Sequence, residues 1–206
     1  SDLSRLDAVI RAPAGRTIGV LGLGIVGNAM CRFLARRNAK LVGADAKADL
    51  GDGASSLREI GVALRLGQVN ADTFADVEAL AISPGVDPNQ AAVRAAIDRG
   101  IPICGELELA GELPAKVVAI TGTNGKSTTT ALTGALVRAA GKRAFVGGNL
   151  GEPVIGWIDS GEEVDVAVLE LSSYQLETAY RFQADVSVVL NVTPDHTDRY
   201  AGFSDY

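Results

Sequence analysis

The segment 121–128 carries residue types that bind nucleotide phosphates. Its sequence, Thr-Gly-Thr-Asn-Gly-Lys-Ser-Thr, lies between an apolar run and a stretch of helical character. Backbone N–H groups in such a turn bind anions together with the N-terminus of the next helix. Lys126 would add a positive charge for the β- and γ-phosphates, and the hydroxyl of Ser127 or Thr128 would bind Mg²⁺. We therefore predict an ATP site made by Gly122, Thr123, Asn124, Gly125, Lys126, Ser127 and Thr128.

This segment departs from the general phosphate-loop pattern at one position. The pattern has a Gly where this sequence has Ile120. An ordinary strand-to-helix turn that contains glycine and a surface lysine is therefore the alternative interpretation. The Gly-Lys-Ser order at 125–127 favours the phosphate loop.

Glu170 and His196 are candidate metal ligands at the ends of two later strands. Glu170 follows the apolar run 164–169, and His196, the only histidine, follows a strand expected near 185–190. Ligands of open α/β sheets bind at the carboxyl ends of the strands, and hard cations prefer oxygen ligands. A solvent-facing glutamate and a surface or core histidine are the alternatives. With acids on both sides, His196 is a candidate for a second metal site.

The run Gly-Leu-Gly-Ile-Val-Gly at 22–27, together with Asp45, fits the fingerprint of a dinucleotide-binding turn. The pattern predicts phosphate or a nucleotide near this turn and does not identify the nucleotide. Taken alone, it favours NAD and an oxidoreductase. That interpretation gives no role to Lys126, Glu170 or His196, so the two nucleotide sites need an interpretation that uses both.

Alternating strands and helices must position these residues. In the first half we expect strands at 17–21, 40–44, 62–66, 80–82 and 101–104, helices at 28–37, 57–60 and 89–99, and a loop at 46–56. In the second half we expect strands at 116–120, 144–146, 164–171 and 185–190 and a helix at 126–140. Such alternation predicts right-handed βαβ units and parallel sheets.

The predicted fold class is α/β with two domains. A Rossmann-like parallel-sheet domain would span residues 1–105, a linker 106–114, and a phosphate-loop ATPase-type central domain 115–206. Because the chain stops soon after the fourth strand of the second sheet, we expect the central domain to be truncated.

The overall composition excludes several classes of protein. The net charge of −6 and the pI near 4.8 argue against general binding to nucleic acid or to a membrane surface, which needs clustered Lys and Arg. Two isolated cysteines, Cys31 and Cys104, suit a reducing compartment. No signal peptide and no apolar run of membrane-spanning length is evident. These features predict a cytoplasmic protein, and we expect a monomer.

Three segments together resemble one protein family. The segment 121–128, the run Leu-Glu-Leu-Ser-Ser-Tyr-Gln-Leu-Glu at 169–177 and the segment 191–198 are similar to motifs of the Mur ligases of peptidoglycan synthesis. Within that family, the run at 169–177 and Ser-Pro-Gly at 83–85 point to the ligases that add D-glutamate. The resemblance covers essentially the whole chain and implies a role in cell-wall biogenesis, cell shape and cell division.

The resemblance implies that residues 1–105 bind a UDP-linked substrate. The substrate-binding residues would be Gly24, Ile25 and Val26 at the diphosphate, Asp45, Ala46 and Lys47 at the uracil and ribose, Ser83, Pro84 and Gly85 along the same cleft, and Asn149 facing the substrate. Val26 lies where a Thr is familiar in the family, so a hydroxyl contact is lost. Lys47 lies where an Arg is often seen, so the charge remains without the planar guanidinium.

The implied activity is ATP-dependent amide formation. ATP would phosphorylate the carboxyl group of UDP-N-acetylmuramoyl-L-alanine, and the amine of D-glutamate would then displace phosphate. The catalytic residues would be Lys126 and His196, and the Mg²⁺ ligands Ser127, Thr128, Glu170 and His196. The family's carboxylated lysine and its amino-acid-binding C-terminal domain would fall beyond Tyr206, so we expect the chain alone to be inactive. A module that only binds the UDP substrate, a Mur ligase adding another amino acid, and an NAD-dependent oxidoreductase are the alternatives.

Overall fold

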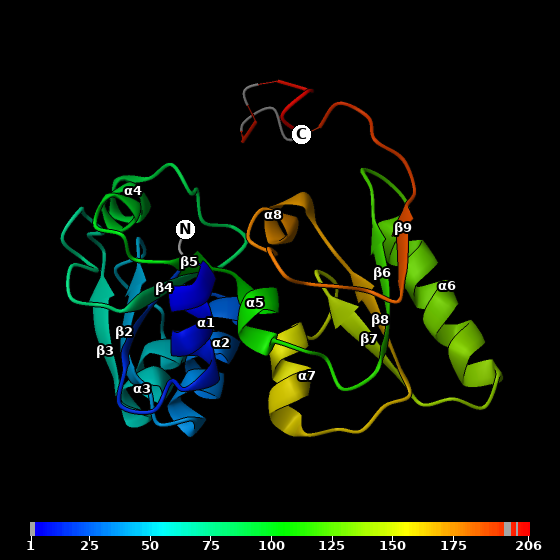
Figure 1. Cartoon of the computed structure of the whole chain (residues 1–206), viewed down its shortest axis with the longest axis horizontal. Coiled ribbons are helices and arrows are strands. Elements are labelled where there is room, and N and C mark those ends of the chain that lie inside the picture. The colour runs from blue at the N-terminus through cyan, green and yellow to red at the C-terminus, as the bar shows by residue number, and fades with distance from the viewer. Residues whose placement is uncertain (1–2, 196–198, 201) are drawn as a thin grey trace. The chain divides into compact units, whose positions relative to one another are not determined.

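The computed structural model of the chain describes residues 3–195, 199–200 and 202–206 (Figure 1). The chain forms two compact units, Ser1–Leu109 and Ala110–Tyr206. Each unit is an all-parallel sheet with helices in the connections, so the predicted α/β class is confirmed. The helices of the described residues are too short or too polar to cross a lipid bilayer.

The first unit contains a five-stranded sheet in the order β3-β2-β1-β4-β5. Its elements are α1 (Leu3–Arg11), β1 (Thr17–Leu21), α2 (Ile25–Arg36), β2 (Lys40–Asp45), α3 (Asp52–Glu59), β3 (Val62–Leu66), β4 (Ala79–Ile82), α4 (Ala91–Asp98), β5 (Ile103–Cys104) and α5 (Glu106–Ala110). The first strand in the chain, β1, lies between β2 and β4. The strand order therefore reverses at β1, which is where ligands bind in open α/β sheets.

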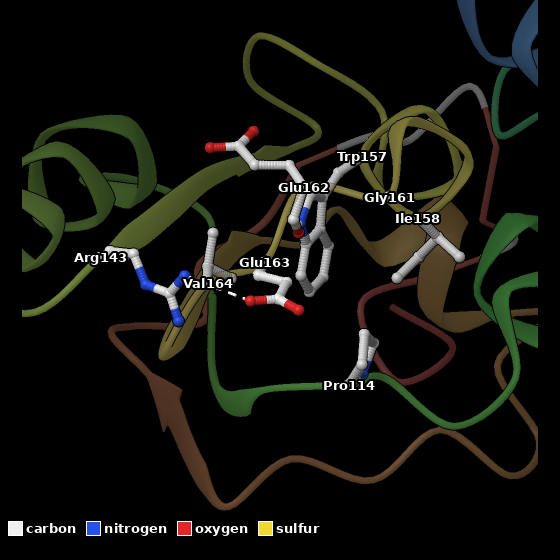
Figure 2. A pocket seen from close by; sticks show the side chains of 8 residues that line it. All are labelled: Pro114, Arg143, Trp157, Ile158, Gly161, Glu162, Glu163 and Val164. Carbon is white, nitrogen blue, oxygen red and sulfur yellow. Dashed lines mark hydrogen bonds and ion pairs between the residues drawn. The ribbon is translucent and has the colours of Figure 1, made fainter.

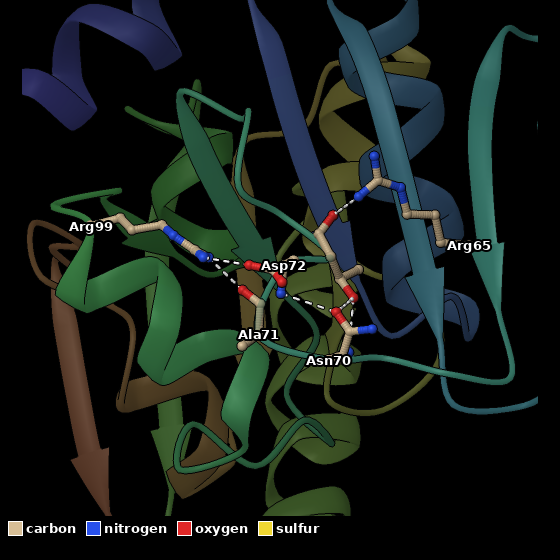
Figure 3. A network of polar contacts seen from close by, with 6 residues as sticks. Arg65, Asn70, Ala71, Asp72 and Arg99 are labelled. Atoms are coloured by element: carbon tan, nitrogen blue, oxygen red, sulfur yellow. Dashed lines mark hydrogen bonds and ion pairs between the residues drawn. The ribbon is translucent and has the colours of Figure 1, made fainter.

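The connection between β3 and β4 is fixed by polar contacts at its surface (Figure 3). Arg65 donates a hydrogen bond to the carbonyl oxygen of Thr73, and Arg99 forms an ion pair with Asp72 at 2.6 Å. Directly after Asp72 and Thr73, which these contacts hold, the connection carries Phe74, which is buried in the core. A Cβ at Gly19 of β1 would lie 2.6 Å from the Phe74 ring, so the sheet needs a glycine there to let the ring pack.

The second unit contains a four-stranded sheet in the order β7-β8-β6-β9. Its elements are β6 (Lys116–Thr121), α6 (Lys126–Ala139), β7 (Ala144–Gly148), α7 (Val154–Ser160), β8 (Val166–Glu170), α8 (Ser173–Leu176) and β9 (Val186–Val189). Again the first strand of the unit, β6, lies between two others, β8 and β9. Both sheets thus place a glycine-rich turn directly after a central strand.

Several predicted boundaries are wrong. Helix α3 begins at Asp52, inside the segment 46–56 that we predicted to be a loop. The segment is polar, but Ala54 and Leu57 bury one helical face, and tertiary packing outweighs the weak local signal. The segment 106–114, predicted to be a linker, contains helix α5, and the boundary between the two compact units lies within this segment. The strand expected at 101–104 is reduced to β5, which begins at Ile103.

Candidate functional site

The segment 121–128 forms the turn between β6 and α6, and two of its glycines have backbone angles that favour glycine. Gly125, just before α6, is left-handed with φ +84°, and Gly122 has φ +139°. A Cβ at Gly122 would lie 3.0 Å from the carbonyl oxygen of Asn191, tighter than side chains normally pack. The turn therefore has a defined shape that ends at the N-terminus of α6, where backbone N–H groups bind anions.

The Lys126 ammonium group lies against this turn. Its Nζ donates hydrogen bonds to the carbonyl oxygens of Gly122 at 2.7 Å and Thr123 at 2.9 Å. Ser127 and Thr128 are exposed in the first turn of α6. The predicted ATP residues therefore lie together around the positive end of a helix dipole, which favours negative charge.

The segment after β9 holds the opposite side of the turn. The Asn191 side chain accepts a hydrogen bond from Asn124 N and donates one to Asn124 O, both at 2.9 Å. The Thr123 hydroxyl accepts a hydrogen bond from Thr193 N at 3.0 Å. The pattern of residues 191–198 drew attention to His196 only, so sequence reasoning missed Asn191. An amide that bonds both groups of one backbone residue fixes the turn much as a neighbouring strand would.

Glu170 is the last residue of β8 and is 2% exposed. It pairs in register with Ile120 of β6, so Glu170 lies at the carboxyl end of the strands, where the turn at 121–128 begins. Its Oε1 accepts a hydrogen bond from Asn149 Nδ2 at 2.8 Å, while its Oε2 is buried without a partner. A buried carboxylate oxygen with no donor is costly. It is also the type of ligand that Mg²⁺ prefers, so Glu170 fits the metal role predicted for it.

The remaining predicted metal ligand, His196, lies outside the described residues. In the part of the chain that the structure describes, no group of three or more His, Cys, Asp or Glu side chains gathers as a metal site. The second metal ligand therefore stays a prediction. Asn191 and Thr193, shortly before His196, contact the turn at 121–128.

In the first unit, the turn at 22–27 is held from both neighbouring strands. The Asp45 carboxylate, at the end of β2, accepts hydrogen bonds from Leu23 N at 2.7 Å and Lys47 N at 2.9 Å. The Ser83 hydroxyl, just after β4, donates to the carbonyl oxygen of Gly22 at 2.6 Å. Both Asp45 oxygens thus bond backbone N–H groups, so this acid already holds the turn before any ribose approaches.

The other predicted substrate residues of the first unit also lie at the carboxyl ends of its strands. Some are exposed and some partly buried, and all follow β1, β2 or β4. The exposed ones are Gly24, Ile25, Ala46, Lys47 and Gly85, and the partly buried ones are Val26 and Pro84. Gly27 is needed for the turn to close, because a Cβ there would lie 1.8 Å from the carbonyl oxygen of Gly22. Asn149, the last predicted substrate residue, belongs to the second unit and bonds Glu170.

A cavity of about 350 Å³ lies in the second unit, at the amino ends of strands β7 and β8 (Figure 2). It is lined by Pro114, Arg143, Trp157, Ile158, Gly161, Glu162, Glu163 and Val164. Arg143 and Val164 precede strands β7 and β8, whereas the phosphate turn follows β6. Because all strands of this sheet are parallel, the cavity and the turn at 121–128 lie at opposite ends of the strands, so the cavity is separate from the predicted ATP site.

Comparison with known proteins identifies both units. Residues 16–105 match the family model of the Mur ligase MurD-like N-terminal domain, and residues 120–206 match the Mur ligase middle domain. The chain belongs to the Mur ligase family. The resemblance predicted from its three motifs is confirmed.

Its Mur ligase relatives include two proteins named UDP-N-acetylmuramoylalanine–D-glutamate ligase. The one from Desulfosudis oleivorans is 45% identical over 194 residues, which cover 93% of this chain and 42% of the relative. The one from Methylobacillus flagellatus is 47% identical over 192 residues, which cover 91% of this chain and 42% of the relative. The chain thus spans about 42% of the length of the curated Mur ligases that it matches.

A solved Mur ligase structure supports the fold. The UDP-N-acetylmuramate:L-alanyl-gamma-D-glutamyl-meso-diaminopimelate ligase from Neisseria meningitides matches with a TM-score of 0.55 at 18% identity. The match covers 93% of this chain and 65% of that one. At this identity the likeness shows a shared arrangement of strands and helices.

Proposed function

We propose that this chain supplies the UDP-substrate-binding and ATP-binding units of an ATP-dependent ligase that adds D-glutamate to UDP-N-acetylmuramoyl-L-alanine in peptidoglycan synthesis. One observation carries the ATP-dependent part. The turn at 121–128, which carries Lys126, and the unpartnered oxygen of Glu170 both lie at the carboxyl ends of neighbouring strands of the second sheet. The names of the relatives support the choice of substrates.

The proposed reaction has two steps. In the first, an oxygen of the substrate carboxylate attacks the γ-phosphorus of ATP, and the bond between this phosphorus and the β,γ-bridging oxygen breaks. The products are ADP and an acyl phosphate of the substrate. In the second, the amine of D-glutamate attacks the acyl carbon, phosphate departs, and the amine loses a proton. Lys126 can exchange its two carbonyl partners for the transferring phosphoryl oxygens. A fixed positive charge there stabilises the negative charge that develops on them.

Mg²⁺ is the cofactor expected at Glu170. Mur ligases use ATP and Mg²⁺, and when bound the ion neutralises charge on the β- and γ-phosphate oxygens. In this chain Glu170 would hold it through Oε2, with a hydroxyl from Ser127 or Thr128 on the first turn of α6. His196 remains the proposed ligand of a second ion.

Titration of the 206-residue chain tests the substrate unit. Calorimetry should detect binding of UDP and of UDP-N-acetylmuramoyl-L-alanine, and no binding of NAD. The variant Ile25→Asp places a carboxylate on the exposed side of the first turn, where Ile25 is 77% exposed, and should weaken UDP binding. The variant Ile97→Asp is the matched control, because Ile97 is 54% exposed on α4. Tight NAD binding without a response to UDP would favour an oxidoreductase.

The ligation itself is tested by phosphate release and amide formation with ATP, Mg²⁺ and both substrates. Since the curated relatives are more than twice as long as the matched region, this assay needs a protein of their length that contains this chain, here called the complete ligase. The same assay on the 206 residues alone tests the prediction that they form no product. An amide product with another amino acid in preference to D-glutamate would contradict the proposed specificity.

A further inference from the structure

Asn149 is bound to Glu170 by two separate contacts. Asn149 comes directly after β7, and Gly148 of β7 pairs in register with Glu170 of β8. The backbone N of Asn149 donates to the carbonyl oxygen of Glu170 at 2.8 Å, and its side-chain Nδ2 donates to Oε1 at 2.8 Å. A Cβ at Gly148 would lie 2.4 Å from the Glu170 carbonyl oxygen, so the close approach of the two chains depends on glycine.

This arrangement divides the two oxygens of one carboxylate between two tasks. Oε1 accepts the Asn149 amide, and Oε2 is buried without a donor. The terminal torsion of a glutamate is soft and two-fold, so the carboxylate could otherwise turn and exchange its oxygens. The amide can donate only to an oxygen that faces it, which leaves the other oxygen in a fixed position. A charged group that is 2% exposed also needs this donor to remain buried.

We infer that Asn149 is a positioning residue that orients Glu170 to present Oε2 to a divalent cation. The inference rests on the proposed function and deepens it, because it assigns the Asn149 side chain to the cation site. Sequence resemblance had suggested that Asn149 faces the UDP-linked substrate. Residues that hold a metal ligand in place typically change metal affinity 10–100-fold when they are replaced.

The two roles predict different kinetics in the complete ligase. A positioning residue changes the Mg²⁺ concentration needed for half-maximal activity and leaves the KM of the UDP-linked substrate unchanged. A substrate contact raises that KM and leaves the Mg²⁺ dependence unchanged. The variants Asn149→Ala and Asn149→Ser both lose the Nδ2 donor, so they should give the same result.

Direct cation binding provides a measurement that does not depend on turnover. Mn²⁺ binding to the 206-residue chain with ADP present can be followed by electron paramagnetic resonance. We expect Asn149→Ala and Asn149→Ser to weaken it at least tenfold, towards the level of Glu170→Gln. Leu150→Ala is the matched control, because Leu150 is the next residue, is 39% exposed and should leave binding unchanged. Trp157 fluorescence during thermal unfolding checks that each variant's second unit is folded.

The outcomes separate the inference from the function on which it rests. If Glu170→Gln loses Mn²⁺ and both Asn149 variants bind like the wild-type chain, the positioning role is wrong and the cation site stands. A raised substrate KM with unchanged Mg²⁺ dependence would likewise overturn the inference in favour of a substrate contact. If the wild-type chain binds no Mn²⁺, the cation site fails and the inference fails with it.

Discussion

The two glycine-rich turns occupy equivalent positions in their sheets but are built differently. Each follows the first strand of its unit, at the point where neighbouring strands lie on both sides. The turn after β1 is held by a carboxylate and a hydroxyl, from Asp45 and Ser83. The turn after β6 is held by the Asn191 amide and carries the Lys126 ammonium.

This difference in charge matches two different tasks. At the first turn the Asp45 carboxylate already accepts a hydrogen bond from Leu23 N, so the turn would offer fewer free N–H donors to a diphosphate. The segment 22–27 also contains no lysine. Such a site can hold a group that stays intact. Under the proposed function, the positive charge of Lys126 at the second turn would lie beside the transferring phosphoryl group, where it would stabilise developing negative charge. Under the proposed function, the same type of turn would serve for binding in the first unit and for chemistry in the second, because different side chains hold it.

Removing Lys126 should produce the largest effect. In the complete ligase, Lys126→Ala should lower kcat by about 10²–10³-fold, by analogy with the loss of one preorganised donor in an active site. Binding of UDP-N-acetylmuramoyl-L-alanine should persist, because its proposed site is on the first unit. Steady-state kinetics and calorimetry measure the two quantities. Near-normal turnover would remove the proposed distinction between the turns.

The first turn should be the more sensitive to added volume. In Gly27→Ala the new Cβ would lie 1.8 Å from Gly22 O, and we expect a loss of about 1–3 kcal/mol or more in the stability of the first unit. Gly24→Ala is the control, since nothing lies within 4 Å of its Cβ, and should cost less than about 1 kcal/mol.

The chain contains a suitable probe for this comparison. Both cysteines are in the first unit and are buried, and burial raises the pKa of the Cys31 thiol to about 12. Cys31 should therefore resist thiol reagents near neutral pH until the first unit unfolds. The urea midpoint of unfolding can be measured from the reactivity of the cysteine thiols. Equal midpoints for Gly27→Ala and Gly24→Ala would show that the turn tolerates the added Cβ of Gly27→Ala.

Loss of the Asn191 clamp should have an intermediate effect at the second turn. Asn191→Ala removes two hydrogen bonds to Asn124, worth together about 1–3 kcal/mol. We expect ATP affinity to fall about tenfold, measured by calorimetry. Thr193→Val is the matched control, because Thr193 contacts Thr123 through its backbone N and O. An unchanged affinity in Asn191→Ala would mean that the turn keeps its shape without the clamp.

Acid should produce the smallest effect, in the second unit. A hydrogen bond from Lys116 lowers the pKa of Asp185, and one from the backbone of Arg143 lowers that of Asp165. Their stabilisation is fully present above the usual pKa of 3.8 and is lost as the pH falls through the lower folded values. Trp157, the only tryptophan, reports on this unit alone. Asp185→Asn should flatten the decline in stability below pH 4, and an unchanged profile would contradict this assignment.

Sequence patterns predicted what is local and missed what depends on distant pairs. Both glycine turns and Glu170 were predicted because each follows an apolar strand within a short segment. The hydrogen bonds between Asn191 and Asn124 join residues 67 positions apart, so no local pattern indicates them. The fingerprint selected Asp45, but it did not indicate that this carboxylate accepts a hydrogen bond from Leu23 N, 22 positions earlier. The role of Asn149 depends on the register of β7 against β8, which a single sequence does not specify.

The capping box of α8 affects how the run at 169–177 should be used as a sequence signature. Ser172 and Gln175 accept hydrogen bonds from each other's backbone N–H groups and so begin α8 soon after Glu170. Two positions of the signature therefore report a helix start, and only Glu170 among these three is a candidate for chemistry. A homologue that has lost catalysis would be free to keep Ser172 and Gln175, because its fold still needs them. Searches for active ligases should accordingly weight Glu170 and Lys126 above the serine and glutamine.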